Sequence, residues 1–409
     1  MTLSSGVTKR IFISDFHMGD NRGMKPYPPH PYSYGWLNKN ISVAADFLHE
    51  QLQKEDISEV IILGDLFDQW VIPLDMDPLT GFDNICNNPA NKSIVDNLKA
   101  LAASPRIKLT YVPGNHDMSI SPESLTIEKK FMQDNFPGIN YICEDGKPAG
   151  VYRAGMLAAE HGDMYCLFNS PDTWTVPDSF LPLGYFITRL TAYKVAQTNK
   201  HENYLDILWN FIKEFKTKPR FIEDFVLAVA ADSGLKPDSL IDMKEIGAFP
   251  EEISVSDISA KFKNLIINWD KNHKNFHAID AMISEAVLSL PARKIYFSKN
   301  AANIVIFGHT HKYTMHKNYL FRNEVIETED ELVSKADELR AKETDRADEK
   351  IKDSSVPCKS IYANSGAWTD ETKVCTYVET EEDPVNKRHY VRIKSYPNNT
   401  LLKEGFVEL

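Results

Sequence analysis

The sequence lacks the cysteine patterns that stabilise small secreted or zinc-binding domains. It has five cysteines in 409 residues, an odd number that leaves one without a partner in any disulfide framework. No two of them form a CxxC pair, so the pattern favours reduced thiols over disulfides or a zinc ribbon. We therefore expect a cytoplasmic protein.

Long apolar runs and basic excess are also missing. No uninterrupted apolar stretch is long enough for a transmembrane helix, and the first seven residues lack a leader's basic and apolar regions. Lys and Arg total 46 against 58 Asp and Glu, which gives a net charge of −12. An acidic chain has no general attraction to phosphate backbones. We expect a small phosphorylated substrate and no extended nucleic acid, while peripheral contact with a membrane stays open.

Apolar runs that end abruptly in polar residues dominate the remaining sequence. Runs of this kind precede Asp15, Asp65, Asn115, His161 and His309. Helical periodicity separates the first three, for example over Ile41–Lys54. Alternating strands and helices predict a layered α/β fold, in which the carboxyl ends of the strands carry the active site.

The stretch 164–298 is mostly helical by its periodicity, as over Tyr204–Phe215 and Ile258–Trp269. It separates two polar strand ends, so we expect a helical insertion between core segments 1–163 and 299–409, forming a cap over one side of the site at those strand ends. Within the second segment, the charged stretch 323–355 predicts a solvated helical excursion or loop.

The polar strand ends form five motifs whose side chains are typical metal ligands. Any one of them alone is a weak signal, but five motifs directly after apolar strands predict a common site. Asn115 lies beside His116, and Asp65 lies three residues before Asp68. The candidate ligands are Asp15, His17, Asp65, Asn115, His161, His309 and His311.

Seven ligands exceed the needs of one tetrahedral ion, which takes about four. Together with a bridging carboxylate, they suit two ions roughly 3.5–4 Å apart. No thiolate is present in the motifs, and mixed imidazole and oxygen ligation suits Mn²⁺, with Fe or Zn as alternatives.

The ordered motifs DxH, GDxxD, GNHD, HGD and GHTH resemble those of the calcineurin-like metallophosphoesterase superfamily. The resemblance spans Asp15 to His311. It implies a four-layer α/β/β/α sandwich with a dinuclear centre. By motif, it assigns one ion to Asp15, His17 and His311, a second to Asn115, His161 and His309, and the bridge to Asp65.

The reaction implied is hydrolysis of a phosphate ester or pyrophosphate bond by metal-activated water. His116 is not required as a ligand, so we expect it to assist the leaving group, with Asp68 orienting and charging it.

Three functional alternatives stay open. The run Gly64–Trp70 and the late motifs His161–Asp163 and Gly366–Trp368 resemble the UDP-2,3-diacylglucosamine pyrophosphohydrolases. That branch commonly has Arg where this chain has His116. A cyclic or short-nucleotide phosphodiesterase is a second alternative, and an inactive metal-binding scaffold is the third. Within the insertion, Ser179–Arg189 is the predicted pocket lining, and Arg22 and Lys25 of the loop Met18–Tyr34 are candidate phosphate-binding cations.

Overall fold

The computed structural model describes residues 8–144, 146–200, 204–213, 220–317, 338 and 357–409. Apart from Glu338, the predicted charged excursion 323–355 lies outside these residues.

The first of two central sheets has seven strands, and its parallel half begins the chain. Strands β1 to β4 run parallel, and β12 pairs antiparallel with β1, followed by β13 and β14. In spatial order the strands are β14 (Thr400–Glu408), β13 (Arg388–Tyr396), β12 (Cys375–Asp383), β1 (Thr8–Ile13), β2 (Ile57–Leu63), β3 (Lys108–Val112) and β4 (Asn140–Tyr141).

The second sheet has five strands and a parallel centre. Strand β9 lies between β6 and β11 and runs parallel to both, while the two edge strands are antiparallel. In spatial order the strands are β10 (Thr314–Lys317), β11 (Ile361–Asn364), β9 (Ile304–Phe307), β6 (Leu157–Ala159) and β5 (Tyr152–Ala154).

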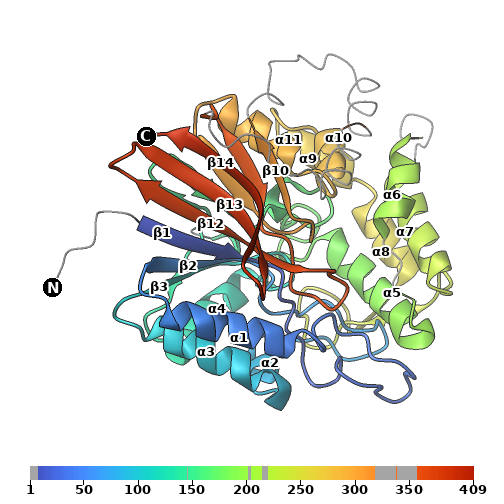
Figure 1. Cartoon of the computed structure of the whole chain (residues 1–409). Coiled ribbons are helices and arrows are strands. Elements are labelled where there is room, and N and C mark those ends of the chain that lie inside the picture. The colour runs from blue at the N-terminus through green and yellow to red at the C-terminus, as the bar shows by residue number, and fades with distance from the viewer. Residues whose placement is uncertain (1–7, 145, 201–203, 214–219, 318–337, 339–356) are drawn as a thin grey trace.

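The apolar residues of these strands define four layers. Alternate side chains of a strand point to opposite faces, so Ile11 and Ile13 pack under the helices while Phe12 faces the second sheet. On the outer face of the second sheet, Val305 and Phe307 pack with Leu288 and neighbouring residues. The helices beside the first sheet are α1 (Ile41–Gln53), α2 (Asp83–Cys86), η1 (Pro89–Asn91), α3 (Lys92–Ala102) and α4 (Pro122–Asn135). The chain is thus an α/β/β/α sandwich, as predicted (Figure 1).

Between the fourth and fifth motifs, the described chain is largely helical and has its own apolar core. The helices from α5 (Leu183–Thr198) to α8 (Val255–Phe262) lie to one side of the sheets, beyond the carboxyl ends of β1 and β2 (Figure 1). Ala292 and Tyr296, near the end of the region, pack on the outer face of the second sheet. The apolar core of the region continues into Trp70 and Met118, which follow the second and third motifs. The elements are η2 (Asp163–Tyr165), α5 (Leu183–Thr198), α6 (Tyr204–Lys213), α7 (Phe221–Asp232), β7 (Leu240–Asp242), β8 (Glu252–Ser254), α8 (Val255–Phe262), α9 (Leu265–Asn272), α10 (Ala278–Ser284), α11 (Ser289–Pro291) and the π-helical turn η4 (Ala292–Phe297).

One predicted helix of this region is wrong. The periodic stretch Ile258–Trp269 is divided between α8 and α9, with a break at Lys263–Asn264. Ile258 and Phe262 of the first piece and Leu265 and Trp269 of the second are buried in the same core, so the periodicity continues across the break.

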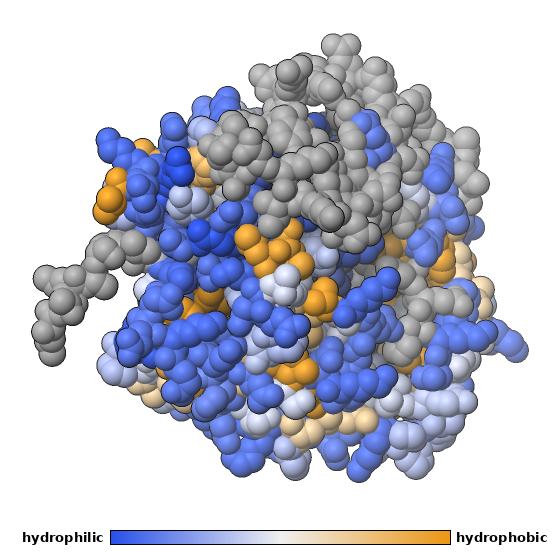
Figure 2. All heavy atoms as spheres, in the orientation of Figure 1, coloured by the Kyte–Doolittle hydropathy of each residue, from blue (hydrophilic) through white to orange (hydrophobic). Residues whose placement is uncertain are grey.

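The viewed face of the molecule is mostly hydrophilic, with apolar side chains in small groups near its centre (Figure 2). In the described part of the chain, no helix has both the length and the apolar character needed to cross a bilayer.

Candidate metal centre

The seven candidate ligands come from loops at the ends of both sheets and meet at one place. Asp15 and His17 follow β1, Asp65 follows β2, and Asn115 follows β3. From the second sheet, His161 follows β6, and His309 and His311 follow β9. The centre therefore lies where the two sheets meet.

The backbone reaches this arrangement in an unusual conformation. Asp15 and His17 have φ values of 58° and 53°, and His309 and His311 have φ values of 71° and 58°. These positive values show that neither pair continues the extended backbone of the strand before it. A left-handed conformation of non-glycine residues costs roughly 1–3 kcal/mol each and occurs mainly at functional sites.

Hydrogen bonds between loops hold this backbone. The amide of Asp15 donates to the Gly64 carbonyl (3.1 Å), and the amide of His17 donates to the Asp65 carbonyl (2.8 Å). The amide of His309 donates to the Asp15 carboxylate at 3.0–3.1 Å. The first, second and last motifs are thereby fixed relative to one another without any ion.

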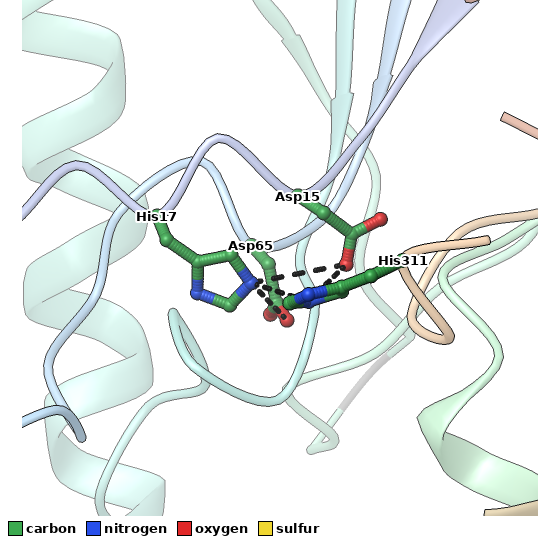
Figure 3. Close-up of side chains that lie close together, drawn as sticks. All are labelled: Asp15, His17, Asp65 and His311. Atoms are coloured by element: carbon green, nitrogen blue, oxygen red, sulfur yellow. Dashed lines mark hydrogen bonds and ion pairs between the residues drawn. The ribbon is translucent and has the colours of Figure 1, made fainter. Parts of the chain in front are cut away.

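The first group of ligands contains Asp15, His17, Asp65 and His311, which point toward one another (Figure 3). The Nε2 atoms of His17 and His311 lie 2.9 Å apart. Asp65 Oδ2 lies 3.5 Å from His17 Nε2, and Asp15 Oδ1 lies 3.5 Å from His311 Nε2. Asp15, His17 and Asp65 are buried, while His311 is partly exposed.

The second group contains Asp65 again, with Asn115, His161 and His309. Asn115 Oδ1 lies 3.0 Å from His161 Nε2 and 2.9 Å from His309 Nδ1. Asp65 Oδ2 lies 3.2 Å from His161 Nε2. The same Asp65 oxygen thus faces an imidazole nitrogen of each group.

Partners on the far side of the rings determine which nitrogens face the centre. His161 Nδ1 lies 2.7 Å from the Leu63 carbonyl oxygen, to which it can only donate. His17 Nδ1 lies 2.9 Å from Asp68 Oδ2. Both rings therefore keep their Nε2 lone pairs directed inward, an arrangement common among metal-binding histidines.

Asp68 serves two histidines. Its Oδ1 atom lies 3.0 Å from His116 Nδ1, and its other oxygen bonds His17. The amides of Trp70 and Val71 also donate to Oδ1. Burial alone would raise the pKa of Asp68, but His116 and His17 outweigh it and hold that pKa well below its usual range. Asp68 is therefore an anion.

His116 is enclosed by two tryptophans. Trp70 and Trp36 lie 4.8 and 5.2 Å from its ring centre. Burial lowers the pKa of His116, but Asp68 and Asp65 reverse the effect and raise it above the ordinary value. Because Asp68 occupies Nδ1, the Nε2 side of the ring is the one left for the pocket.

The imidazoles of His17, His309 and His311 are held neutral. Burial lowers the pKa of His17 to about 4 and lowers those of His309 and His311 well below their usual value. Burial also raises the pKa of Asp15 to about 8 and that of Asp65 well above its usual value. Neutral imidazole lone pairs that face buried carboxylates form a donor set that fits divalent metal ions.

Gly114 permits the close approach of the motifs. A Cβ atom there would lie 2.4 Å from Asp65 Oδ1 and 2.9 Å from the His161 ring. Asp117 closes the same turn by accepting from the amides of Gly114 (2.5 Å) and Leu66 (2.8 Å). Asp117 thus has a structural role in joining these two motifs.

A pocket of about 580 Å³ opens at the centre. One wall comes from the insertion and includes Thr188, Thr191, Ala192 and Val195 of α5. The opposite wall includes the loop after β11. The remaining described lining residues are Trp36, Asp65, Val71, Asn115, His116, Asn169, Leu205, Glu285, His309, Thr310, His311, Lys312, Tyr313, Ala367, Thr369, Glu371, Thr372, Lys373, Val374 and Thr376.

The predicted lining segment Ser179–Arg189 reaches the pocket only through Thr188. Arg189 is fully buried, and its guanidinium donates to the carbonyls of Ile72, Pro73 and Asp242 instead. It attaches α5 to the loop after Asp68. The prediction is wrong there because a buried arginine can bond carbonyls as well as substrate.

The loop Met18–Tyr34 does not supply a phosphate-binding cation in this structure. Arg22 donates to Asp20 Oδ2 (2.5 Å) and to the Asp77 carbonyl (3.0 Å), and neither it nor Lys25 lines the pocket. Trp36, just beyond the loop, is the residue of this region that lines the pocket. Sequence reasoning missed Trp36, Asn169 and Glu285, since none belongs to a recognisable motif.

Comparisons with known proteins identify a family. The family described as calcineurin-like phosphoesterase matches residues 8–313. No curated protein matches the sequence. Among solved structures, Vps29 of Chaetomium thermophilum has a TM-score of 0.28 and 8% identity, with 98% of each chain covered. GAP50 of Plasmodium, titled the anchor in the inner membrane complex, has a TM-score of 0.32 and 10% identity, with 98% of this chain and 89% of that chain covered.

Proposed function

Because the chain belongs to the calcineurin-like phosphoesterase family, whose members generally hydrolyse phosphate esters, we propose that it is a dinuclear-metal phosphoesterase. The observation that carries this proposal is the position of Asp65. Its Oδ2 atom lies within 3.5 Å of His17 Nε2 in one ligand group and of His161 Nε2 in the other. A carboxylate shared in this way suits two neighbouring ions.

In this proposal Asp15, His17 and His311 would hold one ion, Asn115, His161 and His309 would hold the other, and Asp65 would be shared between them. Ions bound there, most suitably Mn²⁺, with Fe or Zn as alternatives, would supply Lewis acidity and an activated water. The residues orient these ions in a buried setting, where electrostatic stabilisation of a phosphoryl group is strong.

His116 is the proposed proton donor to the leaving group. Asp68 fixes its Nδ1 side at 3.0 Å and favours the protonated ring. The two tryptophans restrict ring rotation, so the Nε2–H side is presented to the pocket. A positioned imidazolium typically contributes roughly 10²–10⁴-fold to such a step.

The pocket indicates substrates with a sizeable organic group. About 580 Å³ is within the range of pockets for small organic ligands, which is roughly 300–1,000 Å³. Such a volume suits a cyclic or short nucleotide, the substrate of one open alternative. For the other, a UDP-2,3-diacylglucosamine-type pyrophosphohydrolase, it suits a part of the substrate only. A panel of aryl monoesters, aryl diesters, cyclic nucleotides and nucleotide-linked lipids, with Mn²⁺ supplied, separates them.

His116→Ala tests the proposal. We expect both ions to remain bound, while kcat on an alkyl phosphate falls by roughly 10²–10⁴-fold. The loss on an activated aryl phosphate should be smaller, because that leaving group needs no proton. His49→Ala, at an exposed position on α1, is the matched control and should change neither rate.

Equal losses on both substrates would contradict the role of His116 as proton donor to the leaving group. They would indicate that His116 stabilises the negative charge on the phosphoryl group instead. A wild-type protein that hydrolyses nothing in the panel with Mn²⁺, Fe²⁺ or Zn²⁺ would contradict the enzyme itself and support the scaffold alternative. The cytoplasmic location stays a prediction from the cysteine pattern.

A further inference from the structure

We propose that Glu285, in the insertion, sets the orientation of the Asn115 side-chain amide and thereby the affinity of the second metal position. This inference rests on the proposed function, since it presumes that Asn115 Oδ1 is a ligand. It assigns a positioning role in the centre to a segment that contributes none of the seven candidate ligands.

An asparagine ligand, unlike a carboxylate, can face a metal position with either of two different groups. Its oxygen can bind a cation, but its NH₂ group cannot, and the two ends of the amide are nearly the same shape. Asn115 must therefore be kept with Oδ1 toward His161 and His309. The partner of its Nδ2 atom decides which way the amide points.

That partner is Asn169, the first residue of a hydrogen-bond relay. Asn115 Nδ2 donates to Asn169 Oδ1 at 3.3 Å, and Asn169 Nδ2 donates to Glu285 Oε2 at 2.5 Å. The amide of Phe168 donates to the other carboxylate oxygen at 2.7 Å. Asn169 and Glu285 are only 5% and 3% exposed, so water competes little for these groups.

The polarity of the relay is determined at its far end. A carboxylate only accepts hydrogen bonds, so Glu285 requires Asn169 to present its NH₂ group. Asn169 then turns its Oδ1 atom toward Asn115. Because that oxygen can only accept a hydrogen bond, Asn115 must donate from its Nδ2 atom. Asn115 Oδ1 is thereby left for the metal position. Two neutral amides without Glu285 could reverse together at little cost.

Close packing at Gly184 and the end of α10 hold the relay in place. A Cβ atom at Gly184, in the first turn of α5, would lie 2.4 Å from Asn169 Oδ1 and 2.6 Å from the Phe168 carbonyl oxygen. Gly184 also donates its amide to that carbonyl at 2.7 Å. Glu285 follows the last residue of α10. Two helices of the insertion thus hold the relay against the metal centre.

The experiment measures metal binding directly, by titrating the metal-free protein with Mn²⁺. In Glu285→Gln the acceptor-only end is lost while the volume is kept. We expect the second ion to bind roughly 10–100-fold more weakly, which is typical when an outer partner of a ligand is changed, and the first ion to bind as before. Glu252→Gln, an exposed glutamate of β8 in the same insertion, is the control and should match wild type.

A second variant restores the polarity with exchanged residues. When Asn169→Asp is combined with Glu285→Gln, the acceptor-only carboxylate moves to position 169, so Asn115 must again present Nδ2 to it. We expect the double variant to recover most of the lost affinity for the second ion. A contribution of Glu285 through packing alone predicts no such recovery.

Each other outcome overturns the proposal. If Glu285→Gln binds the second ion as tightly as wild type, or if the double variant binds it as weakly as the single variant, Glu285 does not orient the Asn115 amide. Weakening of both ions together, with a lower melting temperature in both variants, would assign Glu285 to folding instead. A wild-type protein that binds a single ion would contradict the dinuclear centre itself, before any variant is compared.

Discussion

Asp65 is shared by the two ligand groups, so its substitution should affect both ions. In Asp65→Asn the neutral amide offers one oxygen and no negative charge. We expect the affinity for each ion to fall, whereas a substitution within one group should weaken that group's ion most. Metal content after dialysis against a series of Mn²⁺ concentrations measures this.

Asp46→Asn, at an exposed position on α1, is the matched control for charge and should retain two ions. If Asp65→Asn loses one ion and keeps the other at wild-type affinity, the bridging assignment is wrong.

A second residue-scale prediction concerns stability. Glu128 is buried on α4 beside Ser119, and burial raises its pKa to about 8. An unfolded glutamate titrates near 4.3. Folding therefore favours the protonated form, and this contribution to stability is complete at low pH. It is lost as the pH rises through about 8, because the folded protein must then bury a charge.

Glu128→Gln replaces the titrating carboxyl group with a neutral amide of nearly the same size. We expect this variant to be more stable than wild type at pH 9, by on the order of 4 kcal/mol, and nearly equal to it at pH 5. Thermal unfolding at both values measures the difference. Glu123→Gln, exposed on the same helix, should show no such pH dependence. An equal effect at pH 5 and pH 9 would contradict the raised pKa.

At this scale the sequence predicted the residues that carry strong local signals. The structure brings together all seven predicted ligands, because each follows an apolar strand of one sandwich. It also places Asp68 beside His116. Trp36, Asn169 and Glu285 could not be predicted, since their neighbours in sequence are ordinary. The left-handed backbone of Asp15 and His17 could not be predicted either, because it depends on bonds to a different loop.

At the scale of elements, α5 is the part of the insertion that forms a wall of the pocket. Thr191 lies on this wall and is half-buried. Thr191→Phe should narrow the pocket without touching a candidate ligand. We expect kcat/KM to fall by roughly tenfold or more for substrates with a large organic group, and little for phenyl phosphate.

Thr126→Phe makes the same change at an exposed position of α4 and should leave the substrate ranking unchanged. A Thr191→Phe enzyme that slows all substrates equally would show that this wall does not select them.

The elements also show where periodicity stops being informative. Helix α5 is buried on nearly every side, between the insertion core and the pocket. Its polar residues Thr188, Arg189 and Lys194 are buried together with its apolar ones. Periodicity therefore could not show which side faces the pocket, and Arg189 was assigned to it wrongly. Strand β14 was not predicted at all, because it lies on the sheet edge with a partly exposed, mixed pattern.

At the scale of the whole molecule, the fold was predictable because the motifs keep one order along the chain and each follows a strand. The division of these strands between two sheets was implied by the family resemblance and could not be read from periodicity. Hydrophobic alternation shows which residues of a strand are buried but not which sheet the strand joins. The boundaries 1–163, 164–298 and 299–409 stay a prediction.

The two sheets contribute to the centre about equally, and this has a consequence for stability. The first sheet supplies Asp15, His17, Asp65 and Asn115, and the second supplies the three remaining histidines. Without ions, burial opposes the charge on Asp15 and Asp65. Bound ions would neutralise these carboxylates and connect the two sheets through shared ligands.

We therefore expect metal removal to lower the melting temperature of the whole molecule. An ion that binds only the folded state at 100 times its Kd stabilises that state by about 2.7 kcal/mol. Differential scanning calorimetry before and after EDTA treatment, and after Mn²⁺ is added back, measures the shift. Asp65→Asn is the informative comparison, because a protein that cannot hold the ions should melt at one temperature regardless of EDTA. If wild type loses both ions to EDTA and still melts unchanged, the centre does not join the sheets, and its bonds between loops suffice to hold the sandwich.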